Sequence, residues 1–120
     1  MSRVAILGAS SKPERYAHLA QQLLVEKGYT PLPVTPREAD VLGVPAVASL
    51  NELEQPVDTV TLYVGPAHQG RLLGELLALK PRRVIFNPGT ENPELAAALG
   101  DAGIETAMAC TLVMLRTNQF

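Results

Sequence analysis

The stretch RVAILGASSKPERY, residues 3–16, decides the fold class. A short apolar run over 3–7 predicts a buried strand, and Gly8 then permits a tight turn. The polar residues after it lead into an amphipathic segment over 13–28, which predicts a helix closed by Gly28. A strand, a glycine turn and a helix start, in this order, are typical of the first unit of a nucleotide-binding α/β domain.

The same alternation of short apolar runs and helical segments continues along the chain. Strands are predicted at 3–7, 30–34, 58–64, 82–87 and 103–108. Helices are predicted at 13–28, from 49 to about 53, at 67–79 and at 93–102. This order predicts a single α/β domain over residues 1–120, with a three-layer, doubly wound, Rossmann-like parallel sheet of about five strands.

Local signals define several of the helix starts. Ser11 with Glu14, and Ser49 with Glu52, have the spacing of capping boxes. Asn92 stands before Pro93 as a predicted N-cap. The segment 37–48 is predicted to be a connecting loop, and the apolar but aperiodic tail after Met108 is expected to fold back along the core.

Composition narrows the functional classes. Aromatic residues make up 4% of the chain and the net charge is -2, so neither a stacking platform nor a basic face for nucleic acid is expected. No apolar run approaches the roughly 20 residues of a membrane span. The first strand begins by Val4, which leaves no room for a signal peptide, so a cytoplasmic domain without membrane partners is expected.

The first loop predicts an anion site. Gly8 would turn the chain so that a phosphate meets the free N–H groups at the helix start. Ser10 and Ser11 could add hydroxyl donors, while Lys12 and Arg15 add positive charge. The alternative is structural: the glycine only turns the chain and the serine only caps the helix.

The end of the second strand argues against NAD. Domains that bind NAD place an acid there, about 20 residues beyond the glycine loop, to hold the ribose hydroxyls. Here Thr35 stands at that position, and Glu38 and Asp40 follow only in the loop. The usual glycine spacing is missing as well. Arg37 instead suggests a contact to a phosphate or an adenine face.

The motifs ILGASSKPERYA, PVTP, VDTVTLYV, RVIFNPGTENPEL and ACTLVMLRTNQF, in this order, resemble the family of small bacterial and archaeal CoA-binding domain proteins. Those proteins are single Rossmann-like domains related to the CoA-binding domain of succinyl-CoA synthetase and of the ADP-forming acyl-CoA synthetases. Three departures stand out. Many members have PVNP where this chain has PVTP, many have D-x-C where it has Met108-Ala109-Cys110, and a segment that commonly contains glutamine is here FNPGTEN.

The resemblance implies that coenzyme A, or an acyl-CoA, lies across the carboxyl ends of the strands. Its phosphates would lie against the first loop, at Gly8, Ala9, Ser10 and Ser11, with Lys12 and Arg15 nearby. Its nucleotide end would rest on Val34, Thr35, Pro36 and Arg37. The pantetheine arm would run past Val64, Gly65 and Pro66, and past Phe86, Asn87, Pro88 and Gly89.

No catalytic or metal-binding residue is predicted. His18 and His68 are interpreted as surface residues, Cys110 as a buried core thiol, and the pair Arg82-Arg83 as a solvated turn. The sequence therefore favours non-covalent CoA binding without turnover. Two alternatives stay open: a nucleotide-dependent oxidoreductase on the same fold, and an interaction module with a vestigial pocket whose apolar tail, 111–120, forms an oligomer interface such as a homodimer.

Overall fold

A five-stranded parallel sheet is the centre of the computed structural model, which describes residues 2–120. Its strands are β1 (Arg3–Leu7), β2 (Thr30–Val34), β5 (Thr59–Leu62), β6 (Arg83–Phe86) and β7 (Glu105–Met108). They lie in the order β2-β1-β5-β6-β7, and every neighbouring pair is parallel. This sheet confirms the predicted fold class, and its strand order reverses between β1 and β5.

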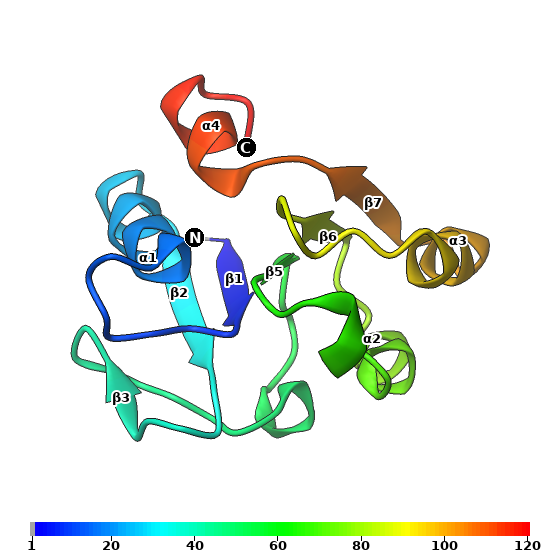
Figure 1. Ribbon diagram of the computed structural model, residues 1–120, viewed down its shortest axis with the longest axis horizontal. Helices are drawn as coiled ribbons and strands as arrows, with labels where there is room; N and C mark the ends of the chain where they lie inside the picture. Colours follow the sequence, from blue (N-terminus) through cyan, green and yellow to red (C-terminus); the bar gives the residue numbers. More distant parts are fainter. Residues whose placement is uncertain (1) are drawn as a thin grey trace.

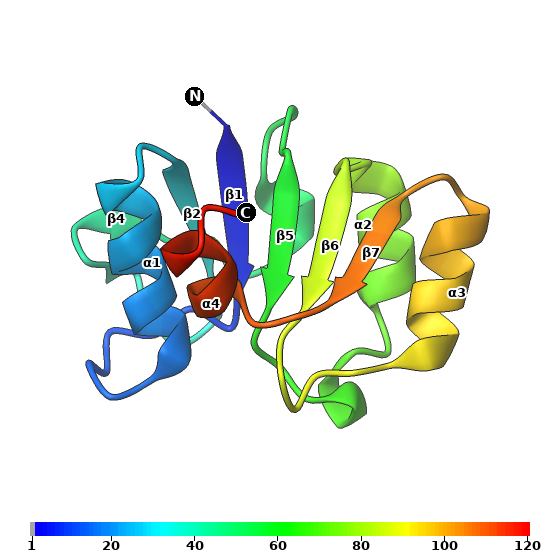
Figure 2. The same cartoon turned by 90° about the horizontal axis from the view of Figure 1, so that it is seen from above.

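Helices cover both faces of the sheet. The helices α1 (Tyr16–Glu26) and α4 (Thr111–Arg116) lie on one face (Figures 1 and 2). The other face carries α2 (Leu72–Leu79), α3 (Pro93–Asp101) and the 3-10 turn η1 (Leu50–Glu52), while a second 3-10 turn, η2 (Pro66–His68), follows β5. The predicted three-layer arrangement is therefore confirmed.

The apolar runs form strands because each is covered on both faces. All residues of β5 and β6 are buried, including the threonines of β5, so both strands are covered on both faces of the sheet. The larger core lies between the sheet and α2 and α3, and includes the fully buried Leu62, Leu76, Phe86 and Leu99. A second core lies under α1 and α4. Among residues 2–120, no helix combines the length and apolar character needed to cross a membrane.

Two of the three predicted helix caps are confirmed. Asn92 Oδ1 accepts the N–H of Leu95 at 3.1 Å, and Ser49 and Glu52 form the capping box at η1. The box predicted for Ser11 and Glu14 is wrong, since α1 begins only at Tyr16 without a side-chain cap. The hydroxyl of Ser11 instead donates to a carboxylate from another loop, which is described below.

Two predictions for irregular segments are wrong in part. The segment 37–48 contains an antiparallel hairpin, β3 (Asp40–Val41) with β4 (Val44–Pro45). Its turn is formed by Leu42 and Gly43, at φ 52° and 77°, as a two-residue hairpin loop requires. The tail after Met108 does return to the core, but as the helix α4, which lies against α1.

Candidate functional site

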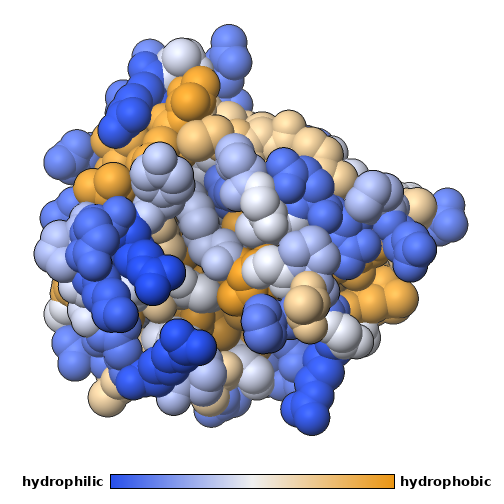
Figure 3. All heavy atoms as spheres, in the orientation of Figure 1, coloured by the Kyte–Doolittle hydropathy of each residue, from blue (hydrophilic) through white to orange (hydrophobic). Residues whose placement is uncertain are grey.

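The reversal of strand order opens a position for a ligand where β1 and β5 end. The loops that leave these two strands turn toward opposite faces of the sheet, and such a switch point is where doubly wound folds bind ligands. In Figure 2 the strands point toward this edge. Figure 3 faces it, and shows hydrophilic side chains around a hollowed centre in which apolar atoms are visible.

Gly8 brings the first loop against the end of β5. Its φ is +91°, and a Cβ at this position would lie 3.1 Å from the backbone carbon and oxygen of Tyr63 and from Val64 Cγ1. Real Cβ contacts are almost always longer than this. Glycine is therefore needed both for the turn and for the close approach of the two loops.

Most polar groups of the first loop have partners inside the protein. The N–H groups of Gly8 and Ala9 both donate to the carbonyl oxygen of Val34, at 3.0 and 3.3 Å, and so fix the loop to the end of β2. The N–H of Lys12 donates to Ser10 Oγ at 3.1 Å. At the start of α1, the N–H groups of His18 and Leu19 donate to the carbonyl oxygen of Arg15, so those of Tyr16 and Ala17 remain for an anion.

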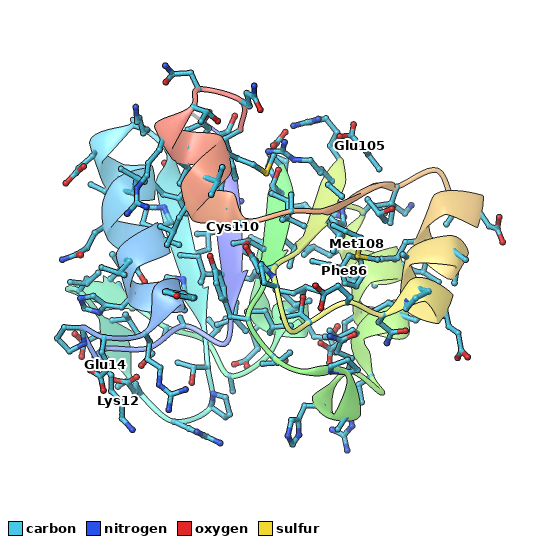
Figure 4. The ribbon with its side chains drawn as sticks, turned by 45° about the horizontal axis from the view of Figure 1, so that its top comes forward. Lys12, Glu14, Phe86, Glu105, Met108 and Cys110 are labelled. Atoms are coloured by element: carbon cyan, nitrogen blue, oxygen red, sulfur yellow. The ribbon has the colours of Figure 1, made fainter. Side chains whose placement is uncertain are left out.

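Three basic side chains surround this loop. Lys12, Arg15 and Arg37 are all exposed, so their charges are available to a ligand. Figure 4 shows Lys12 on the loop that precedes α1, together with Glu14. The first loop thus combines positive charge with a helix start.

Glu38 is a residue of this loop cluster that sequence reasoning missed. Its carboxylate accepts the N–H of Ser11 at 3.0 Å, and also accepts the hydroxyl of the same serine. These hydrogen bonds, with a smaller contribution from the charge of Lys12, lower the pKa of Glu38 below its ordinary value. The sequence signal was an acid after the second strand. The position of an acid in a loop does not follow from the sequence alone, and in this structure the loop after β2 places Glu38 beside the first loop.

The second loop is buried at its start and exposed at its tip. Val34 and Thr35 are buried, whereas Pro36 and Arg37 are exposed. The hydroxyl of Thr35 accepts the N–H of Arg37 at 3.2 Å, which holds the turn that presents the arginine. The N–H of Thr35 donates to the carbonyl oxygen of Val47.

Gln69 joins the loops that follow β5 and β6. Its side-chain amide donates to the carbonyl oxygens of Val64 and Thr90, each at 2.9 Å, and accepts from the amide of Asn92 at 2.9 Å. A Cβ on Gly65 would lie 4.0 Å from the carbonyl oxygen of Gly89, so these two loops lie side by side. Pro66, Pro88 and Gly89 are exposed at this edge, and Val64 is half-buried.

The side chain of Asn87 is used inside the protein. It is 2% exposed, and its amide donates to Thr61 Oγ1 at 2.6 Å and to the carbonyl oxygen of Leu62 at 2.8 Å. Its Oδ1 accepts the N–H of Thr111 at 2.8 Å, at the start of α4. Asn87 therefore joins β5, β6 and α4, and in this structure only its backbone is left for a ligand. Phe86, directly before it, is fully buried beneath the loop.

The structure corrects several interpretations of single residues. His18 is 6% exposed rather than solvated, and its Nδ1 donates to the carbonyl oxygen of Ser10 at 3.0 Å, which supports the first loop from below. Cys110 is partly exposed at the N-cap of α4, not a fully buried thiol (Figure 4). Arg83 is 5% exposed and lies 4.4 Å from the ring centre of Phe120. His68 is exposed, as predicted.

Tyr63 is a further polar group near this edge. Burial raises the pKa of its hydroxyl to about 12, and within residues 2–120 that hydroxyl has no hydrogen-bond partner.

Two concavities lie away from this edge of the sheet. One, of about 170 Å³, is lined by Lys27, Tyr29, Leu115, Asn118 and Phe120. The other, of about 250 Å³, lies between η1 and α2. Neither includes a predicted ligand-binding residue.

Residues 2–116 match the family model described as CoA binding domain. The chain belongs to this family. A crystal structure of an uncharacterized protein is 44% identical, with a TM-score of 0.95, and the match covers 100% of this chain and 98% of that one. The recognition of the family and the Rossmann-like fold predicted from the sequence are thereby confirmed.

Two further proteins are similar to this chain. The uncharacterized protein YneT of Bacillus subtilis is 38% identical over 61 residues, which is 51% of this chain and 45% of YneT. A dinucleotide-forming acetyl-coenzyme A synthetase of Ca. Korarchaeum cryptofilum, solved with phosphate and ADP, has a TM-score of 0.77 at 16% identity. That match covers 90% of this chain and 25% of the synthetase, and it shows a shared fold.

Proposed function

We propose that this chain binds coenzyme A, or an acyl-CoA, non-covalently at the carboxyl ends of its strands. The phosphates lie at the first loop, close to Lys12 and Arg15, and the nucleotide rests on the segment 34–37. The pantetheine arm passes between the loops that contain Gly65 and Gly89. The proposal includes no turnover by this chain.

The observation that carries the proposal is the close approach at Gly8. In a chain of the CoA-binding domain family, this contact brings a helix start and exposed basic side chains to the point where the strand order reverses. The loops around it are fixed by Val34, Gln69 and Asn87, so a ligand would meet a prearranged surface. Prearrangement favours binding because less freedom is lost when the ligand is held.

Isothermal titration with CoA tests the proposal, with NAD and ATP titrated in parallel. We expect one-to-one binding of CoA, without a comparable signal for NAD. Lys12→Gln should weaken CoA binding about three- to tenfold, because a charged hydrogen-bond donor to phosphate is removed. Lys27→Gln is the matched control, since Lys27 lies at the other end of α1.

The alternatives give different results. Heat with NAD and none with CoA would refute the proposal and favour the oxidoreductase. Silence from every nucleotide, together with a dimer by mass measurement in solution, would favour the interaction module. An equal loss of CoA affinity in the Lys12 and Lys27 variants would contradict the position assigned to the phosphates.

A further inference from the structure

The donors of Ser11 already hold an anion that belongs to the protein. Both its N–H and its hydroxyl donate to the carboxylate of Glu38, with 3.0 Å between the backbone nitrogen and Oε2. Glu38 lies between β2 and β3, so this pair joins two segments that are 27 positions apart in sequence. Ser11 is one of the four residues of the first loop, with Gly8, Ala9 and Ser10, against which the resemblance placed the ligand phosphates.

A carboxylate and a phosphate oxygen cannot both use these donors. Each is an anionic acceptor, and at hydrogen-bond distance from the same serine they would repel each other. The contact is at the surface, and Ser11 is exposed, so a glutamate side chain can leave without unfolding its surroundings. Lys12 and His18 are the charged or titratable groups that face the carboxylate.

We infer that Glu38 is a specificity-determining residue: its carboxylate occupies the Ser11 donors in the free protein, and the phosphates of the ligand must displace it. This inference rests on the proposed function, because it assigns the ligand phosphates to the first loop. A ligand with several phosphate charges can compete for Ser11 with the help of Lys12 and Arg15. A neutral or singly charged ligand competes poorly, so Glu38 restricts the loop to polyanions.

Calorimetric titration of CoA into matched variants tests this role. Glu38→Gln removes the negative charge and keeps the size of the side chain, and should bind CoA about two- to fivefold more tightly, because a contact at the surface contributes little. Glu14→Gln is the control, since Glu14 is an exposed carboxylate on the same loop (Figure 4). In a Ser11→Ala background the gain from Glu38→Gln should shrink, because the contested hydroxyl is gone. General damage to the fold would not raise affinity.

A second readout follows Glu38 directly. Titration of its carboxyl group by NMR should give a pKa below the ordinary value in the free protein, because the Ser11 hydrogen bonds favour the charged form. With saturating CoA the pKa of this carboxyl should move back toward its ordinary value. A Glu38 that titrates normally in the free protein overturns the inference and leaves CoA binding intact.

The outcomes separate this inference from the proposed function. If the unmodified protein binds CoA and Glu38→Gln leaves the affinity unchanged, the displacement is wrong and the function stands. If Glu38→Gln weakens binding, the carboxylate holds the ligand, for example at a ribose hydroxyl, and the assigned role is reversed. If neither protein binds CoA, the proposed function fails, and the inference fails with it.

Discussion

Alanine substitutions at Gly8 and Gly28 provide a sharp test of the first loop. Both glycines have φ near +90°, but a Cβ at Gly28 meets no atom within 4 Å, whereas one at Gly8 would lie 3.1 Å from the backbone of Tyr63. In either variant, alanine at positive φ destabilises the folded protein by about 1–2 kcal/mol. Alanine also reduces the conformational freedom of the unfolded chain, and this offsets about 0.4–1 kcal/mol of that cost. Crowding adds about 1–3 kcal/mol at Gly8 alone.

We therefore expect the free energy of unfolding to fall by about 1 kcal/mol in Gly28→Ala and by about 2–4 kcal/mol in Gly8→Ala. Urea unfolding measures both, and an unchanged m-value would show that the midpoints report stability. CoA affinity should fall only in Gly8→Ala, since only that glycine holds the first loop beside β5. Equal costs in the two variants would refute the close approach. A Gly8→Ala protein with full CoA affinity would refute its part in binding.

Three more predictions concern polar contacts. Asn87→Ala leaves the N–H of Thr111 buried without a partner and should lower the free energy of unfolding by about 2–3 kcal/mol. Urea unfolding measures this loss, and a value below about 0.5 kcal/mol would contradict the prediction. His18→Phe keeps the buried ring but removes the bond to the first loop, so CoA affinity should fall about fivefold with little change in melting temperature. A larger effect on melting than on binding would make the histidine purely structural. The hydrogen bond from Arg82 lowers the pKa of Asp58 below 3.8. The ionised carboxylate therefore stabilises the folded protein above that pH, and this stabilisation is lost as the pH falls through the lowered pKa. In Asp58→Asn the urea midpoint should no longer fall at acid pH for this reason. If the midpoint depends on pH as in the unmodified protein, the contact between Asp58 and Arg82 is not the cause of that dependence.

The sheet could be predicted because its signals are local. The runs 3–7 and 30–34 match β1 and β2 residue for residue, since a strand buried on both faces needs only a short apolar run between turn residues. Proline in β2 is tolerated because β2 is an edge strand. The N-cap at Asn92 was equally visible, because it depends on neighbours in sequence.

The contacts that organise the site could not be predicted, because they join distant segments. Nothing near Glu38 in sequence indicates that it reaches Ser11, and nothing near His18 indicates a bond beneath the first loop. The hairpin at Leu42 was hidden because leucine rarely adopts positive φ. The short helix α4 gave no periodic signal, and its first N–H group donates to Asn87, which directly follows β6.

The proposed binding at this edge is better described as an exchange of hydrogen-bond partners than as the filling of an empty site. Ser11 is bound to Glu38, and the N–H of Gly89 donates to the carboxylate of Glu91 at 2.9 Å, so two loops at the edge already hold carboxylates of the chain itself. A ligand gains only the difference between its own contacts and those it displaces. Residues that tie the loops together, such as Gln69, should therefore lower stability and affinity together when replaced. A residue that occupies ligand donors, as inferred for Glu38, should raise affinity when its charge is removed. A substitution that lowers CoA affinity therefore indicates a residue that holds the loops in place, such as Gln69, whereas one that raises the affinity indicates a residue that competes with the ligand, such as Glu38.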